Sequence, residues 1–137
     1  MDSNIIKNLF RIGMISSVNV SNMTARVRFV DRDNTESYDL HILNRGSKTH
    51  KDYWIPSIDE QVLCCYLPAI GGSGVGEGFI IGSFFSDVDT PIKTGVGVRR
   101  IDFGDGSFVE HDTASGSITI NATGDVIIQG ANVRINE

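Results

Sequence analysis

A glycine-rich segment at residues 71–78 contains the pattern most suggestive of phosphate binding. It runs Gly-Gly-Ser-Gly-Val-Gly-Glu-Gly. A phosphate-binding loop needs a helix directly after it and usually a lysine, because helix amides and the ammonium group hold the phosphate oxygens. This segment has no basic residue, and a strand is predicted to follow it. We therefore interpret it as a flexible loop between two strands.

Acidic residues occur in pairs that could serve acid–base catalysis. Asp59 precedes Glu60, and Asp87 lies two residues before Asp89. Both pairs fall in predicted turns, where solvated charge is the simpler explanation. Residues 31–34 (Asp-Arg-Asp-Asn) resemble the start of a calcium loop but lack its glycine and its distal glutamate. The sequence thus predicts no catalytic residue and no metal site.

The two cysteines, Cys64 and Cys65, are adjacent. Neighbouring residues on a strand point to opposite faces, so a disulfide between them would be strained. Neither has a histidine nearby that would activate it as a nucleophile. We interpret both as reduced residues in or beside a core strand, which fits assembly in the cytoplasm. The protein is therefore predicted not to be an enzyme and to need no cofactor.

The formal net charge is −5 over 137 residues. An acidic chain is a poor general binder of nucleic acid and of anionic membranes, since both rely on lysine and arginine. No signal peptide is expected at the N-terminus, and no apolar stretch approaches the ~20 residues of a membrane helix.

The elements expected up to residue 86 are mainly strands. A short helix is predicted over 1–11, capped by Asp2 or Ser3. Alternating or continuous apolar side chains predict strands that follow it, with a turn at 21–23. This pattern favours an OB-type barrel over 12–86, a small closed sheet without free edges. Its expected strands are 12–18, 25–30, 36–43, 61–67 and 78–85.

A linker is predicted over 87–97, and the sequence becomes repetitive over 98–137. A strand–turn–strand unit at 101–110 precedes short strands at 117–121, 125–129 and 132–136. Aliphatic residues recur in steps of eight and then seven, from Ile118 to Val126 and to Val133. So short a period is typical of β-helices and related fibres.

This repetitive tail has too few apolar side chains to offset the entropy lost on ordering a thin ribbon alone. Three copies wound around an axis would bury these side chains and pair every strand edge. The alternative is a monomeric meander folded back on the barrel. The predicted core of the trimer consists of Ile101, Phe103, Phe108, Ile118, Ile120, Val126, Ile128, Val133 and Ile135.

Four segments resemble the OB-fold domain of phage baseplate assembly protein V, the central spike family of contractile tails. They are 13–18 (Gly-Met-Ile-Ser-Ser-Val), 25–29 (Ala-Arg-Val-Arg-Phe), 54–63 (Trp-Ile-Pro-Ser-Ile-Asp-Glu-Gln-Val-Leu) and 78–84 (Gly-Phe-Ile-Ile-Gly-Ser-Phe). Their order and spacing match over most of 12–86, and the β-helical tail follows where the family has it.

The resemblance implies a homotrimer. Its OB domains would form a collar on the baseplate hub protein, and its tails would wind into a needle driven into the target cell envelope. The protein would then be part of a virion or injection particle assembled in the host cytoplasm. Asp59 stands where the family usually has glycine, and aspartate tolerates left-handed backbone well.

The end of the needle also departs from some family members, which carry a His-x-His pair that binds an axial metal ion. The histidines here, His41, His50 and His111, lie far apart, so no such site is predicted. The short needle would end bluntly, which suggests a separate PAAR-like tip protein.

Tyr53 and Trp54 are interpreted either as packing at the barrel end or as a contact with the hub protein.

Two functions other than a structural role remain as alternatives. An OB module that binds single-stranded nucleic acid would need a basic groove with stacking aromatics, of which Arg26, Arg28 and Tyr38 supply a weak version. A cell-wall hydrolase is the enzymatic alternative, which would clear a peptidoglycan suspension.

Overall fold

The computed structural model describes residues 3–71 and 74–137. It divides into two compact units, Met1–Thr90 and Pro91–Glu137, which are described separately. The predicted N-terminal helix is α1 (Ser3–Leu9). The proposed cap at Asp2, and the middle of the glycine-rich segment at 72–73, lie outside the described residues. No helix in the described part of the chain is both long and apolar enough to cross a membrane.

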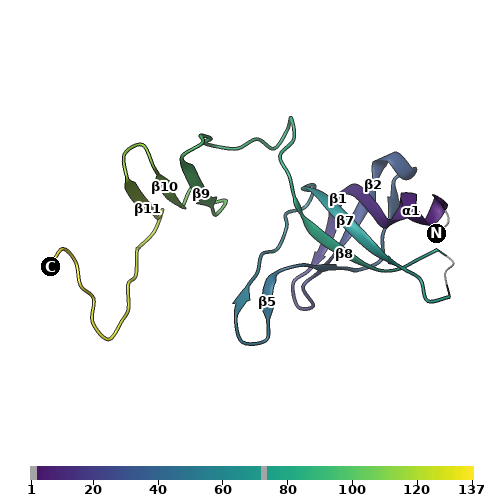
Figure 1. Cartoon of the computed structure of the whole chain (residues 1–137), viewed down its shortest axis with the longest axis horizontal. Coiled ribbons are helices and arrows are strands. Elements are labelled where there is room, and N and C mark those ends of the chain that lie inside the picture. The colour runs from purple at the N-terminus through teal and green to yellow at the C-terminus, as the bar shows by residue number, and fades with distance from the viewer. Residues whose placement is uncertain (1–2, 72–73) are drawn as a thin grey trace. The chain divides into compact units, whose positions relative to one another are not determined.

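The first unit is built from strands, as predicted (Figure 1). A single 3-10 turn, η1 (Val30–Arg32), interrupts them. In the part of the chain that the structure describes, strands account for 45% of residues and helix for 5%, so the all-β prediction is confirmed. The strands of this unit are β1 (Phe10–Asn19), β2 (Thr24–Phe29), β3 (Thr35–Glu36), β4 (Leu40–Ile42), β5 (Arg45–Ser47), β6 (Lys51–Asp52), β7 (Gln61–Pro68) and β8 (Val75–Ser83).

Five of these strands close into a barrel. Their order is β1-β7-β8-β4-β2, and pairing of β1 with β2 completes the ring. The β4–β8 pair is parallel, whereas the other barrel pairs are antiparallel. This connectivity is OB-like, in agreement with the sequence-based prediction.

The barrel core follows directly from side-chain alternation. On β7, for example, Val62, Cys64 and Tyr66 are buried, while the intervening residues face outward. Full burial of each large apolar side chain contributes roughly 1.5–3 kcal/mol to the free energy of unfolding. The first unit therefore has a hydrophobic core within its own chain, made of ten residues. The core consists of Ile15, Ala25, Val27, Phe29, Leu40, Ile42, Val62, Cys64, Tyr66 and Ile80.

The predicted strand over 36–43 is split in two, because Ser37 hydrogen-bonds to β2 with its side chain. The amide of Val27 donates to Oγ of Ser37 at 2.9 Å, and the amide of Ser37 donates to the carbonyl of Val27 at 2.8 Å. A side-chain hydroxyl thus replaces a backbone carbonyl in the ladder, and β3 and β4 become separate strands.

The turn before β7 adopts the left-handed backbone expected to be tolerated at Asp59, whose φ is 68°. The amide of Asp59 donates to the carbonyl of Ile15 at 2.8 Å, and the amide of Ile15 donates to the carbonyl of Glu60 at 3.0 Å. The turn is therefore fastened to β1, and aspartate supports it without glycine.

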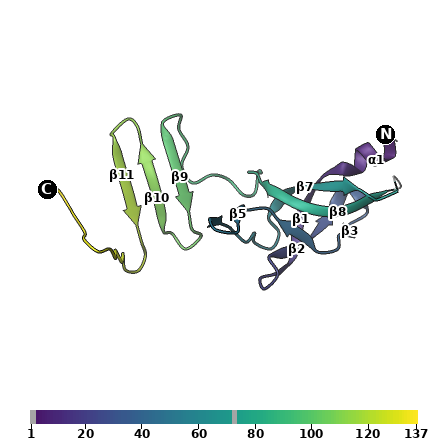
Figure 2. The ribbon, with the colours of Figure 1, turned by 60° about the horizontal axis from the view of Figure 1, so that its bottom comes forward.

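The second unit is a three-stranded antiparallel meander (Figure 2). Its strands are β9 (Val98–Asp102), β10 (Phe108–Asp112) and β11 (Ser117–Asn121). Gly104 and Gly106 have φ of 86° and 96°, values that favour glycine, and they turn the chain between β9 and β10.

The strands predicted at 125–129 and 132–136 are not formed in the single chain. Residues 122–137, all of which the structure describes, contain no strand. A strand needs a partner for its amide and carbonyl groups, and one copy of the chain supplies none for these segments.

Candidate functional site: the open face of the second unit

The meander has two chemically different faces because side chains alternate along each strand. Val109 lies opposite Ile101 on β9 and opposite Ile120 on β11. Ile118 shares this face, two residues before Ile120, and so do His111 and Arg99, because His111 pairs with both Ile118 and Arg99. We call this surface the open face, and its aliphatic members are Ile101, Val109, Ile118 and Ile120.

The open face has no cover within its own unit. Ile101, Ile118 and Ile120 are 60%, 71% and 62% exposed. The other predicted core residues, Phe103, Val126, Ile128, Val133 and Ile135, are exposed as well. No apolar side chain anywhere in 91–137 is buried, so this unit lacks a hydrophobic core of its own.

Phe108 lies apart from the other predicted core residues. It pairs with Asp102 and Asn121, which places it on the face opposite Ile101 and Ile120. The Arg100 guanidinium carbon lies 3.8 Å from the centre of its ring, a cation–π contact. Val109, which the sequence analysis did not select, occupies the central position on the open face.

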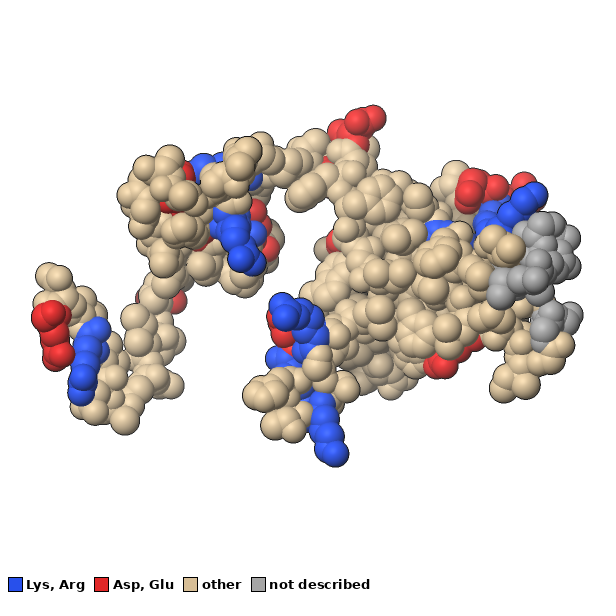
Figure 3. Space-filling view, viewed as in Figure 1, with Lys and Arg blue, Asp and Glu red and all other residues tan. Residues whose placement is uncertain are grey.

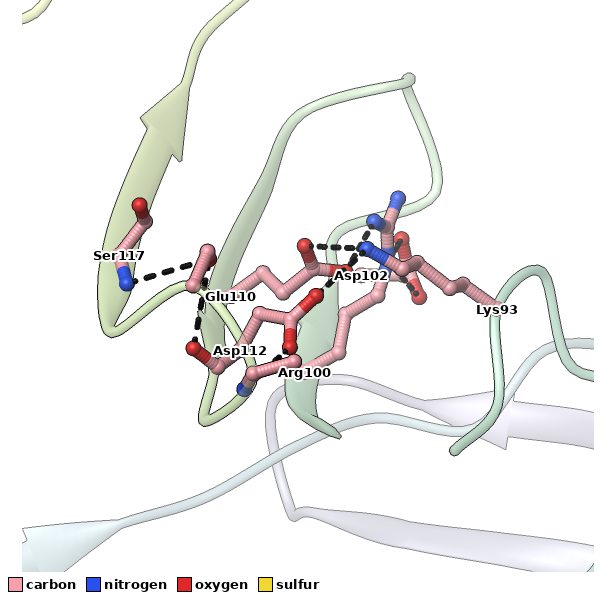
Figure 4. A network of polar contacts seen from close by, with 8 residues as sticks. Lys93, Arg100, Asp102, Glu110, Asp112 and Ser117 are labelled. Carbon is pink, nitrogen blue, oxygen red and sulfur yellow. Dashed lines mark hydrogen bonds and ion pairs between the residues drawn. The ribbon is translucent and has the colours of Figure 1, made fainter. Parts of the chain in front are cut away.

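The opposite side, which we call the charged face, carries a cluster of ion pairs (Figure 4). Nζ of Lys93 lies 2.8 Å from Oε2 of Glu110, and Nη1 of Arg100 lies 3.0 Å from Oε1 of the same carboxylate. Nε of Arg100 also lies 2.9 Å from Oδ1 of Asp102, and Glu110 is buried. This face is thus satisfied by its own chain, including Lys93 from the segment before β9.

The cluster also determines the protonation of its members. Hydrogen bonds from Lys93 and Arg100 hold the pKa of Glu110 below its ordinary value. The same carboxylate raises the pKa of Lys93 and of Arg100 through its hydrogen bonds to them. All three groups are therefore more firmly charged in the folded unit than in an unfolded chain.

This arrangement predicts acid sensitivity of the meander. Because the folded pKa of Glu110 is lowered, its stabilising contribution is complete above its ordinary pKa of 4.5. That contribution is lost as the pH falls through the lower folded value. Glu110→Gln is expected to unfold at lower temperature at pH 7 and to lose this part of the pH dependence. Thermal unfolding followed by circular dichroism from pH 7 to pH 3 checks this, with Glu137→Gln as control; equal curves for Glu110→Gln and wild type would contradict it.

Tyr53 and Trp54 lie in the first unit. Trp54 is half-buried and packs against the barrel core, whereas Tyr53 is exposed. The packing interpretation therefore applies to Trp54, and Tyr53 is the more exposed of the two.

The residues considered for nucleic-acid binding do not form a basic groove. Nε of Arg26 lies 3.1 Å from Oδ1 of Asp39, and Arg28 lies opposite Glu36. Tyr38 is exposed, and it lies between Glu36 and Asp39 in the sequence. Acidic partners close to the arginines oppose contact with phosphates.

The other residues considered in the sequence for catalysis or metal binding are the two cysteines and the acidic pairs. Cys64 and Cys65 are both free thiols, and burial raises the pKa of the Cys64 thiol to about 12. Oε1 of Glu60 accepts a hydrogen bond from the amide of Ser57 at 2.9 Å, which fastens the turn before β7. In the described part of the chain, no three histidine, cysteine or acidic side chains gather as a metal site.

In comparisons with known proteins, no family model and no curated protein matches the chain. The open face and the charged face are therefore the features from which a function must be inferred.

Proposed function

We propose that this protein is the trimeric central spike of a contractile phage tail or a related injection system. The observation that carries the proposal is the open face, which presents four aliphatic side chains, with Arg99 and His111 beside them, in a unit that buries no apolar residue. Apolar surface of this kind is stable in water only when a partner covers it. The segments that resemble baseplate assembly protein V supply the identity of the assembly.

Three copies wound around one axis would complete the second unit. The open faces would meet at the axis, and the charged faces would point to solvent, where ion pairs are tolerated. Residues 124–137 would gain strand partners from neighbouring chains, which would extend the meander into an intertwined β-helical needle. Contraction of the sheath would drive this needle into the target cell envelope.

The barrels would form a collar on the baseplate hub protein. Phe10 and Ile12 of β1 and Leu67 of β7 are exposed and face away from the barrel core. An apolar patch on a barrel that already has a full core is typical of a protein contact. In this role the protein is a mechanical part of the particle, with no enzymatic activity, no cofactor, no axial histidine metal site and a PAAR-like protein at its tip.

The experiment that tests this proposal is a mass measurement in solution. Light scattering after size exclusion is expected to give about three times 14.9 kDa, unchanged over a hundredfold dilution, because the apolar interface is obligate. A monomer of 14.9 kDa at micromolar concentration would refute the spike.

A further inference from the structure

A hairpin that projects from the barrel gathers three basic side chains within eight residues. β5 and β6 form it, and we call residues 45–52 the cationic hairpin. It contains Arg45, Lys48 and Lys51 against a single acid, Asp52, in a chain of net charge −5. Figure 3 shows blue side chains gathered on this projection. Within residues 3–71 and 74–137, none of these three cations takes part in an ion pair.

A pocket opens at the base of the cationic hairpin. Its apolar wall consists of Leu43, Tyr53, Trp54 and Ile81, and Arg45 and Asp52 stand at its rim together with Asn44. The same Arg45 and Asp52 border the hollow of the hairpin itself. The surface therefore combines an apolar base with a cationic edge, and it suits an apolar side chain flanked by carboxylates.

The chain contains a segment with that chemistry at residues 86–89, which we call the acidic turn. Oγ of Ser86 accepts hydrogen bonds from the amides of Val88 and Asp89 at 3.3 and 3.0 Å. The amide of Ser86 donates to the carbonyl of Asp89 at 2.9 Å. Val88 is 88% exposed at the centre, and no ion pair of the described chain involves Asp87 or Asp89.

The hairpin and the turn leave the barrel at the same end. β4 and β8 are parallel neighbours, with Ile42 beside Ile80. The hairpin begins three residues after Ile42, and β8 ends at Ser83, shortly before the turn. This is also the end from which the chain passes into the second unit. In a threefold-symmetric trimer, each copy would offer its acidic turn to one neighbour and its cationic hairpin to the other.

We infer that the acidic turn of one copy docks on the cationic hairpin of the next copy. Val88 enters the pocket against Tyr53, and Asp87 and Asp89 pair with Lys48 and Lys51. This assigns Tyr53 to the contact between copies instead of to the hub. The inference rests on the proposed trimer, and it deepens the proposal because it states how the barrels of the collar are joined. Charge complementarity between the two segments carries it.

The test is zero-length cross-linking of mixed trimers of the full chain. Unlabelled and ¹⁵N-labelled chains are unfolded together, refolded, and treated with a carbodiimide, which couples a carboxylate to a lysine only when they touch. Mass spectrometry is expected to find Asp87 or Asp89 joined to Lys48 or Lys51 in mixed-isotope pairs as often as in matched pairs. The yield is expected to fall at 1 M salt, because exposed charges are then screened within about 3 Å.

Other outcomes separate the inference from the proposed function. Only matched-isotope pairs would place the contact within one chain and overturn the inference. A trimer by mass without this cross-link would also overturn it while leaving the spike intact. A monomer by mass would overturn both.

Charge reversal provides a second measurement that does not depend on the cross-linker. Lys48→Glu with Lys51→Glu is expected to lower the temperature at which the trimer dissociates. Adding Asp87→Lys with Asp89→Lys is expected to restore that temperature. The control adds Asp31→Lys with Glu137→Lys, which makes the same change in charge and is expected to give no rescue. If both pairs of lysine substitutions restored the temperature equally, the rescue would come from net charge alone. That result would contradict the contact between the acidic turn and the cationic hairpin.

Discussion

Ile120→Asp is expected to convert the proposed trimer into monomers. Ile120 lies on the open face beside Val109, the central residue of that face, so three copies would bring three carboxylates to the axis. Burying an unpaired charge costs several kcal/mol per ion, and the lost apolar contact adds roughly 2–5 kcal/mol per copy. Light scattering at micromolar concentration is expected to give a mass near 14.9 kDa.

The design of this experiment relies on the exposure of Ile120 in the single chain. Because its side chain is already solvated there and lies outside the core of the barrel, the substitution is expected to leave the barrel of the monomer folded. Ala114→Asp is the matched control, since it adds the same charge in the exposed turn between β10 and β11. A trimer that survives Ile120→Asp would show that the open face is not the contact between copies.

Phe29→Ala is expected to destabilise the barrel by about 3–5 kcal/mol. Phe29 is among the largest fully buried side chains of the chain. Its ring lies beneath the Arg11 guanidinium, whose central carbon is 5.3 Å from the ring centre. Truncation leaves a cavity in a closed barrel that cannot collapse freely, and it removes one aromatic face from Arg11. Urea unfolding followed by fluorescence of Trp54, the single tryptophan, measures the loss.

The effect of Phe29→Ala on the stability of the barrel must be measured separately from any contribution of assembly to the unfolding free energy. Phe29→Ala is therefore compared in the Ile120→Asp background, where dissociation does not add to the unfolding free energy. Phe85→Ala is the matched control, because Phe85 is exposed and surface substitutions usually change stability by less than about 0.5 kcal/mol. Similar losses for both phenylalanines would argue against the core assigned to the barrel.

The barrel strands were predictable because their side chains alternate or form an apolar run. β1, β2, β7 and β8 all satisfy that condition, and each was predicted close to its observed position. The hairpin of β5 and β6 was not predicted, because its residues are polar and carry no periodic signal. The break between β3 and β4 depends on the Ser37 hydroxyl reaching β2, a contact that local sequence does not encode.

The sequence predicted that the second unit has uncovered aliphatic side chains, but it did not predict which of them share one face. Repeated aliphatic residues in 98–137 were sufficient to predict a ribbon that needs partners. Which of them share a face depends on the register across the turn between β9 and β10. That register pairs Phe108 with Asp102, so Val109 and not Phe108 lies beside Ile101 and Ile120. A shift of one residue in a strand exchanges its two faces.

Alternation along a strand is a local property, and it was therefore sufficient to predict the all-β class and most strands of the barrel from the amino-acid order alone. Contacts between distant residues are not local. The ion-pair cluster unites Lys93, Arg100 and Glu110, and closure of the barrel joins β1 to β7 and β4 to β8. Only the tertiary structure decided which face of the second unit is satisfied by its own chain and which is left open, because pairing register and ion-pair geometry depend on how separate strands meet.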